Sequence, residues 1–243
     1  MNGSAAVIPP VRAVDGVADP TAPLFSVRGL CKHFHSGGSM QTVLDSLDLD
    51  LQPCSLSLIC GPSGSGKSTL LSILGGMERA DSGQIRYRHQ ALELMSQDSL
   101  AGLRNREFGF LFQTPYFVPY KNVLENILLP AHYAPVDRSA VSDSAVALAE
   151  WVGIGRLLDK SPAYLSGGEL QRMAFARALL LSPKVIFADE PTASLDKENA
   201  GILMELMRER VEHGGAVIMV SHDPSLFGWC DRILKLSQGR VIE

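Results

Sequence analysis

One short stretch combines glycines, hydroxyls and a lysine in a spacing that suits phosphate binding. The stretch is Gly61-Pro62-Ser63-Gly64-Ser65-Gly66-Lys67-Ser68-Thr69, and it fits the pattern G-x-x-x-x-G-K-[ST]. Glycines let backbone N–H groups curl around a phosphate without a Cβ in the way. Lys67 can reach the β- and γ-phosphates of a nucleotide, and Ser68 offers a hydroxyl to Mg²⁺. The stretch therefore predicts a phosphate loop.

Two adjacent carboxylates follow an apolar segment further along the chain. Val185–Ala188 reads as a buried strand, and it delivers Asp189 and Glu190 to its end. Neighbouring carboxylates repel, and a magnesium ion on the phosphates would relieve that repulsion. Asp189 would then hold the metal, and Glu190 would orient or deprotonate water. A solvent-exposed acidic turn is the alternative.

A second helix start also carries glycines. Ser166 and Glu169, three residues apart, form a capping box around Gly167 and Gly168. Each glycine costs about 1 kcal/mol against alanine in a helix, so capping alone does not account for them. An anion that approaches the bare helix end would. Only the first helix start has a lysine and carboxylates, so we expect two chains to lie head to tail and complete each other's sites.

Alternating strands and helices must position these residues. Leu70, Ile73 and Leu74 share one face of the helix that follows the phosphate loop, and the strand at 56–60 precedes it. Further strands are expected at 25–28, 43–51, 84–88, 108–112, 185–188, 216–220, 232–236 and 240–242, and helices at 99–106, 123–129, 139–152, 165–181, 199–211 and from Pro224 with an Asp223 cap. This order predicts an α/β fold with a mainly parallel sheet. It also predicts an N-terminal antiparallel β region turning at Gly37-Gly38 and an inserted helical subdomain at about 114–182.

Composition narrows the class of protein. The 243 residues carry a formal net charge of −4 and a pI near 5.9, which argues against nucleic acid as the main partner. No apolar run approaches the ~18–20 residues of a membrane span. Residues 1–23 show no signal-peptide pattern and predict a flexible, proline-rich tail before a domain at 24–243. The four cysteines form no C-x-x-C pair, which favours a reducing cytosol.

In chain order, six motifs and single residues resemble those of the ATP-binding subunits of ABC transporters. They are Gly61–Thr69, Gln113, Leu165–Gln171, Val185–Glu190, Ser194-Leu195-Asp196 and His222. The resemblance covers about Leu24 to Glu243 and implies a P-loop NTPase core that hydrolyses ATP with Mg²⁺ in a head-to-tail homodimer. Cys54-Ser55 replaces the Gly-Glu that the family usually has, which implies a changed turn and unchanged chemistry.

The resemblance also implies roles for single residues. Ser166, with the two glycines after it, would meet the γ-phosphate held by the other chain, and Asp196 would communicate across the dimer. His222 would contact the γ-phosphate, and Gln113 would sense Mg²⁺ and water. Phe34 stands where the family places an aromatic ring that stacks on adenine. As a residue type, it is equally compatible with a place in the core.

Within the family, the stretch Gly61–Leu71 and Leu124-Glu125-Asn126 resemble the group that includes lipoprotein-releasing, macrolide-exporting and cell-division ATPases. Those subunits work at the cytoplasmic side of the membrane with a separate integral permease and often a periplasmic adaptor. Tyr116, Phe117, Val118 and Tyr120 would form the cleft for the permease's coupling helix, or else pack within the helical part. Transport, mechanical signalling across the membrane, and non-transport work on ribosomes or DNA all remain open. The last usually comes with fused ATP modules or long coiled coils, and this chain shows neither.

Overall fold

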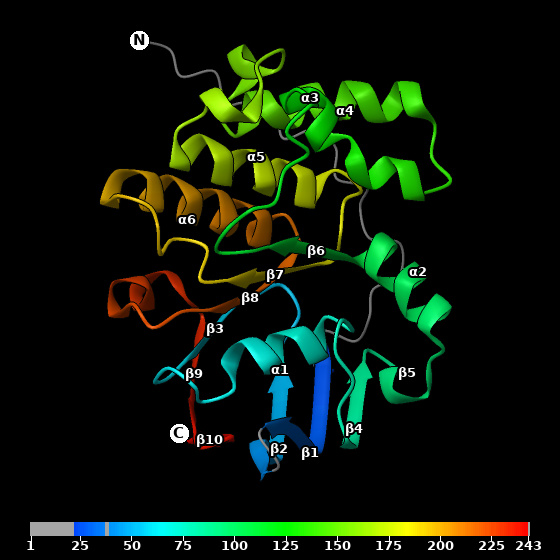
Figure 1. Ribbon diagram of the computed structural model, residues 1–243, viewed down its shortest axis with the longest axis vertical. Coiled ribbons are helices and arrows are strands. Elements are labelled where there is room, and N and C mark those ends of the chain that lie inside the picture. Colours follow the sequence, from blue (N-terminus) through cyan, green and yellow to red (C-terminus); the bar gives the residue numbers. More distant parts are fainter. Residues whose placement is uncertain (1–21, 37–38, 243) are drawn as a thin grey trace.

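The computed structural model describes residues 22–36 and 39–242 (Figure 1). The expected tail, apart from Ala22 and Pro23, and the Gly37-Gly38 turn lie outside these residues. The strands are β1 (Phe25–Ser36), β2 (Ser39–Leu51), β3 (Leu56–Cys60), β4 (Ser82–Tyr87), β5 (Gln90–Ala91), β6 (Phe108–Leu111), β7 (Val185–Asp189), β8 (Ala216–Val220), β9 (Arg232–Ser237) and β10 (Arg240–Ile242). The α-helices are α1 (Lys67–Leu74), α2 (Gln97–Glu107), α3 (Val123–Ile127), α4 (Arg138–Trp151), α5 (Gly167–Leu179) and α6 (Lys197–Glu212). Short 3₁₀ helices are η1 (Leu92–Leu94), η2 (Leu129–Tyr133), η3 (Gly155–Leu157), η4 (Pro162–Tyr164) and η5 (Pro224–Trp229).

In this part of the chain the strands form two sheets. A six-stranded sheet has the order β10-β9-β3-β8-β7-β6, and a four-stranded sheet has the order β2-β1-β4-β5. The β6–β7, β7–β8, β8–β3 and β3–β9 pairings are parallel, and the β9–β10 pairing at the edge is antiparallel. The N-terminal sheet is antiparallel throughout. The α/β fold with a mainly parallel sheet and an antiparallel N-terminal region is therefore confirmed.

The central strands are mostly apolar because both faces of the large sheet are covered. In β8, Val217 and Met219 belong to an apolar cluster shared with α5 and α6, whereas Ile218 and Val220 belong to a second cluster shared with α1 and the antiparallel sheet. Figure 1 shows α5 and α6 on one side of the sheet and α1 on the other. The candidate site lies at the carboxyl ends of these strands.

Several elements differ in extent from the sequence expectation. Strand β1 was expected to end at Arg28 but continues to Ser36, with register shifts against β2 that interrupt its apolar alternation. Helix α5 ends at Leu179, two residues early, and the expected helix after Pro224 is a 3₁₀ helix capped by Asp223. Periodicity alone does not reveal a strand that continues through bulges.

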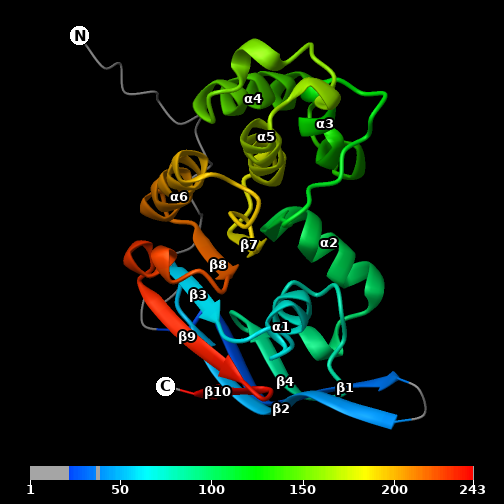
Figure 2. The ribbon, with the colours of Figure 1, turned by 60° about the vertical axis from the view of Figure 1, so that its left-hand side comes forward.

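Residues 114–182, all of which the structure describes, contain only helices, turns and loops. Figure 2 shows α3, α4 and α5 gathered at one end of the molecule, away from the antiparallel sheet. Asn126 is fully buried here and donates its side-chain amide to the carbonyls of Val118, Lys121 and Asn122. In the described part of the chain, every helix is too short or too polar to cross a bilayer.

Candidate nucleotide site

The turn between β3 and α1 has the backbone geometry of a phosphate loop. Gly66 caps α1 in the left-handed region with a φ of 100°, and Gly61 and Gly64 also have positive φ. A Cβ on Gly66 would lie 2.8 Å from the Val43 carbonyl oxygen, and one on Gly61 would collide with the Leu236 carbonyl. Glycine is therefore required at both positions, and the N-terminus of α1 points its free N–H groups into the loop.

Lys67 and Ser68, at the end of the loop, contact different partners. Lys67 is buried, and its Nζ donates to the carbonyl oxygens of Gly61 and Pro62, each at 2.9 Å. Ser68 is exposed, and its Oγ donates to Asp189 Oδ1 at 3.0 Å. Pro62, Ser63 and Gly64 are exposed at the crown, Ser65 is buried and Thr69 is half-buried. The Ser68 hydroxyl thus joins the loop to the end of β7, whereas the Lys67 ammonium bonds within the loop.

Asp189 and Glu190 follow β7, as the sequence predicted. Burial raises the pKa of Asp189, the charge of Glu190 raises it further, and Ser68 and Lys67 act in the opposite direction. A cation beside Asp189 would relieve this strain on its ionised form. Glu190 has a φ of 45°, an uncommon conformation for a residue with a side chain and one that often marks functional sites.

Two side chains from the end of β8 hold the Glu190 carboxylate. Ser221 Oγ donates to Glu190 Oε2 at 3.0 Å, and His222 Nδ1 lies 2.8 Å from Oε1. Ser221 is almost fully buried, whereas the His222 side chain is 70% exposed. The sequence analysis singled out His222 and missed Ser221. Its position directly after the strand that neighbours β7 in the sheet could have indicated that Ser221 lies beside Glu190.

Gln113 lies two residues beyond β6, which pairs in parallel with β7. Its side chain is exposed and makes no hydrogen bond to Asp189 or Glu190 in the described part of the chain. Its carbonyl accepts a bond of 3.2 Å from Gln171 Nε2, and so does the carbonyl of Phe112. Gln171 was named from sequence only as the end of the Leu165–Gln171 motif, without a role of its own, and it is a polar residue on the buried face of α5. It links the helix after Ser166 to the backbone of Gln113.

The helix start at Ser166 has the expected capping box. Ser166 Oγ accepts from the Glu169 N–H at 3.3 Å, and the Ser166 N–H donates to Glu169 Oε2 at 2.9 Å. These hydrogen bonds lower the pKa of Glu169. No hydrogen bond or ion pair among the described residues joins this helix start to the phosphate loop. Within the described part of one chain, such contacts therefore do not link the two glycine-containing helix starts.

The two glycines in this helix start have different surroundings. A Cβ on Gly167 would have open space, whereas one on Gly168 would collide with the Asn199 side chain. Packing against Asn199 is by itself a sufficient reason for glycine at position 168, whereas no packing contact requires glycine at position 167. Asp196 caps α6 by accepting from the Asn199 N–H at 2.8 Å, and it also accepts from the Asn199 side chain. Asn199 therefore ties Gly168 to Asp196.

Phe34 is 41% exposed on β1, which argues against the core position that the sequence left open. The aromatic residues after Gln113 differ in their burial. Tyr116 and Tyr120 are exposed, whereas Phe117 packs against the core cluster of the helical part under the Arg177 guanidinium, 5.3 Å from its ring. Of the two alternatives left open by the sequence, packing within the helical part therefore describes Phe117.

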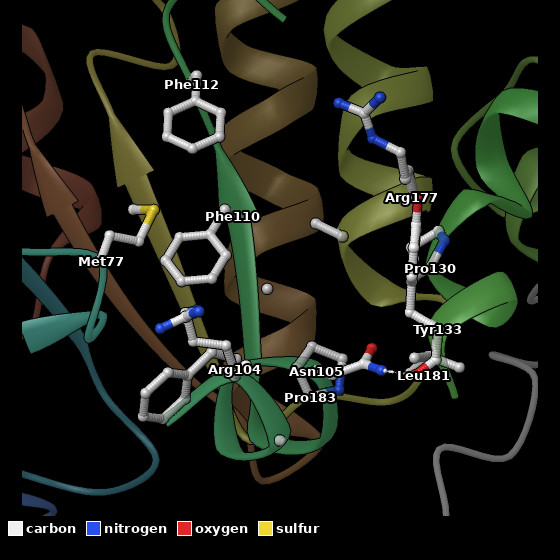
Figure 3. A pocket seen from close by; sticks show the side chains of 15 residues that line it. Met77, Arg104, Asn105, Phe110, Phe112, Pro130, Tyr133, Arg177, Leu181 and Pro183 are labelled. Atoms are coloured by element: carbon white, nitrogen blue, oxygen red, sulfur yellow. Dashed lines mark hydrogen bonds between the residues drawn. The ribbon is translucent and has the colours of Figure 1, made fainter. Parts of the chain in front are cut away.

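A cavity of about 650 Å³ lies instead between α2, β6, η2 and the end of α5. Figure 3 shows Phe110, Phe112 and Met77 on one side of it and Tyr133 on another. Phe112 precedes Gln113 directly, so this largely apolar hollow adjoins the candidate site through the backbone. None of Tyr116, Phe117 or Tyr120 lines it.

Known proteins resemble this chain along most of its length. A family model described as ABC transporter matches residues 44–193. The chain is 39% identical over 217 residues to LolD of Shewanella oneidensis, the ATP-binding protein of a lipoprotein-releasing system, covering 89% of this chain and 94% of that protein. It is 38% identical to the macrolide export ATP-binding/permease protein MacB 2 of Aeromonas hydrophila, covering 91% of this chain and 34% of that protein. It thus spans about a third of the length of the MacB relatives it matches.

Solved structures agree with the sequence relatives. The dimeric structure of a bacterial ABC transporter cassette has a TM-score of 0.83 and 29% identity, covering 90% of this chain and 97% of that one. A dimeric post-hydrolysis state of an ATP-binding cassette with ADP and Pi has a TM-score of 0.81 and 30% identity, with the same coverage. Sequence and structure together place the chain in the ABC transporter family, in which it is an ATP-binding domain of the ATPase type.

Proposed function

We propose that this chain binds ATP, hydrolyses it in a head-to-tail pair of identical copies, and drives an integral membrane permease. The observation that carries the proposal is that two helix ends carry different parts of one phosphate site. The N-terminus of α1 has a lysine, a hydroxyl and two carboxylates beside it, whereas that of α5 has its capping box and the open Gly167 but no carboxylate pair. Each end completes the other only when two chains meet, and dimeric cassettes of the family support this arrangement.

In this proposal the phosphates lie in the loop Gly61–Thr69, with Lys67 on the β- and γ-phosphates and Phe34 stacked on the adenine. Oxygen donors suit Mg²⁺, which commonly takes one or two protein ligands and fills its shell with phosphates and water. Ser68 Oγ and Asp189 fit this pattern, with Gln113 as a further ligand. The ion would neutralise charge on the phosphates.

The catalytic roles fall to residues at the ends of β7 and β8. Glu190 takes the proton of the attacking water, held for this by Ser221 and His222. His222 also contacts the γ-phosphate. From the second copy, Ser166, Gly167, Gly168 and Glu169 present the N-terminus of α5 to the same phosphate, and Asp196 lies at the junction of the two copies.

A mixing experiment tests the shared site. Lys67→Ala removes the phosphate-binding lysine, and Gly167→Asp blocks the N-terminus of α5 with a carboxylate. Each variant alone is expected to be inactive. In a mixed head-to-tail dimer, however, the intact loop of one chain meets the intact α5 of the other, so mixing is expected to restore ATP hydrolysis. If both sets of residues acted within one chain, no mixture would recover activity, and the proposal would fail.

We propose further that the permease is a separate subunit and that the cavity beside Phe112 receives it at the cytoplasmic side of the membrane. The apolar lining of the cavity supports this, as does the match over 94% of a LolD protein. The relatives named for lipoprotein release and macrolide export favour an export or release function, with a periplasmic adaptor reached through the permease.

Docking is tested with permease-containing vesicles. Tyr133→Glu puts a charge on the cavity wall and is expected to lose the stimulation of ATP hydrolysis by the permease. Tyr116→Glu is the matched control, because Tyr116 is equally exposed but lies outside the cavity. Equal stimulation of both variants would contradict this docking site. A transport assay in the same vesicles separates transport from mechanical signalling.

A further inference from the structure

Strand β1 carries a lysine that is more deeply buried than its charge would suggest. Lys32 is 7% exposed, and its Nζ donates to Glu78 Oε1 at 2.6 Å and to the Arg79 carbonyl at 2.8 Å. Asp81 Oδ1 lies 3.6 Å from the same Nζ. The hydrogen bond to Glu78 raises the pKa of Lys32, so the ammonium stays charged. A buried cation needs such partners, and these partners also fix the direction in which the Lys32 ammonium points.

The ammonium also lies over the ring of Phe34, with Nζ 5.0 Å from the ring centroid. The two residues are two apart on one strand, so their side chains leave the same face of it. A cation at this distance attracts the electron-rich face of an aromatic ring. Because Phe34 is 41% exposed, part of the ring surface that Lys32 does not cover remains accessible to a ligand.

The same hairpin rests on the phosphate loop. Lys32 pairs with Leu44, and Phe34 pairs with Gln41 further out on β2. Leu44 and Val43 lie so close to Gly66 that a Cβ there would be 2.9 Å from Leu44 Cδ2. Phe34 therefore lies near the loop. Its strand partner Gln41 is two residues from Val43, which corresponds to about 7 Å along the hairpin at strand spacing.

The partners of Lys32 belong to the segment that follows α1. The N–H of Glu78 bonds to the Ser72 carbonyl of α1 at 3.2 Å. Asp81 accepts from the His33 N–H at 2.6 Å, and its own N–H donates to the Cys31 carbonyl at 3.0 Å. Helix α1 thus begins at the phosphate loop and ends in a segment that is fastened to β1 around Lys32. The ring and the loop are parts of one connected unit.

We propose that Lys32 is a positioning residue for Phe34, which it holds so that the free ring surface stacks on the adenine of a nucleotide whose phosphates lie in the loop. This inference rests on the proposed ATP site. It assigns to Lys32 a role in binding the base and none in binding the phosphates.

The experiment compares two probes, Mg-ATP and Mg-tripolyphosphate, by calorimetric titration. Lys32→Met keeps the length of the side chain and removes the charge. It is expected to weaken Mg-ATP about three- to tenfold, the range for a partly buried cation–ring contact, and to leave Mg-tripolyphosphate binding unchanged. Lys32→Arg, which keeps a cation, is expected to recover most of the Mg-ATP affinity. Lys160→Met is the control, because Lys160 is exposed in the helical part.

Phe34→Ala completes a double-mutant cycle. If Lys32 acts through the ring, Lys32→Met has no further effect on Mg-ATP once the ring is gone. Additive losses, or an equal loss for both probes, would overturn the inference and leave the ATP site standing. Should Lys32→Met fail to fold, Glu78→Gln loosens the ammonium and is expected to give a smaller loss that is again confined to Mg-ATP. A parent chain that binds neither probe would overturn the proposed function and this inference together.

Discussion

The backbone of Gly168 lies against the side chain of Asn199, so closely that a methyl group on Gly168 would overlap the amide. Asn199 cannot easily move away. Arg172 donates to its Oδ1 at 2.7 Å, and Asp196 accepts from both its backbone and its side chain. The neighbouring Gly167 has no atom within 4 Å of the same added methyl. Two adjacent glycines therefore serve different purposes.

The same substitution at the two glycines is expected to give different results. Gly168→Ala should destabilise the monomer by about 1–3 kcal/mol through overpacking. Gly167→Ala should change its stability by no more than ~1 kcal/mol, yet it should weaken ATP-dependent dimerisation because the methyl would stand between α5 and the partner's phosphate. Thermal unfolding and size-exclusion chromatography with ATP measure the two effects. A Gly167→Ala chain that dimerises like the parent would remove Gly167 from the interface.

Replacing the proposed general base should separate ATP binding from hydrolysis. Glu190→Gln is expected to bind Mg-ATP with nearly the parental affinity and to lose about 10²–10⁴-fold in kcat. Trapped dimers should accumulate with ATP. A variant that hydrolyses ATP at the parental rate would rule out Glu190 as the base.

Ser221 should matter through Glu190 alone. Ser221→Ala removes one charge-assisted hydrogen bond and is expected to lower kcat about tenfold, with KM for ATP unchanged. Ser221→Thr keeps the hydroxyl and should restore most of the rate. If Ser221→Ala slows the Glu190→Gln enzyme by the same factor, the serine acts by some other route.

Lys67 is expected to contribute to nucleotide affinity and little to the fold. Its Nζ now bonds to the Gly61 and Pro62 carbonyls, groups that water can also satisfy at the exposed crown. Lys67→Ala should weaken Mg-ATP about 10- to 100-fold, as expected for the loss of hydrogen bonds to charged groups, while the melting temperature changes little. Tight ATP binding by this variant would place the phosphates elsewhere.

The half-buried carboxylate Asp189 should make stability depend on pH. Its pKa is raised above the ordinary value of 3.8, so the folded state binds its proton more strongly than the unfolded state does. The resulting penalty is present above the raised pKa and disappears as the pH falls toward 3.8. Asp189→Asn should therefore melt above the parent near neutral pH, and this advantage should shrink as the pH falls.

Asp223 is the matched control for that measurement. Its pKa is lowered, chiefly by the hydrogen bond from the Ser225 backbone, so its stabilising effect is lost only below 3.8. The gap between Asp223→Asn and the parent should stay flat over the pH range in which the Asp189→Asn gap closes. A gap that stays constant for Asp189→Asn as well would show that its burial does not disfavour the carboxylate.

Much of this molecule could be predicted from local patterns. The phosphate loop, the capping box and the carboxylates after β7 depend on residues adjacent in sequence. Residue type and spacing therefore predicted the loop, the box and the strand ends. The alternation of strands and helices predicted the parallel sheet for the same reason.

What escaped prediction depends on contacts between distant segments. Ser221 and Glu190 are 31 residues apart, and Gln171 and Phe112 are 59 apart. Such pairs become visible only once the strand order is known. The packing of Asn199 against Gly168 escaped prediction for the same reason, because the two residues are distant in sequence.

The order β8-β7-β6 has a consequence for how this chain tolerates change. Gln113, Glu190 and His222 each follow a different one of these neighbouring strands, so the backbone ladder sets their mutual spacing. A one-residue insertion inside β7 would turn Asp189 to the opposite face and is expected to abolish the proposed ATP hydrolysis. Insertions in the exposed stretch 135–137, between η2 and α4, would leave that spacing intact. Recognition of partners can therefore diversify in the helical part while the catalytic centre stays fixed.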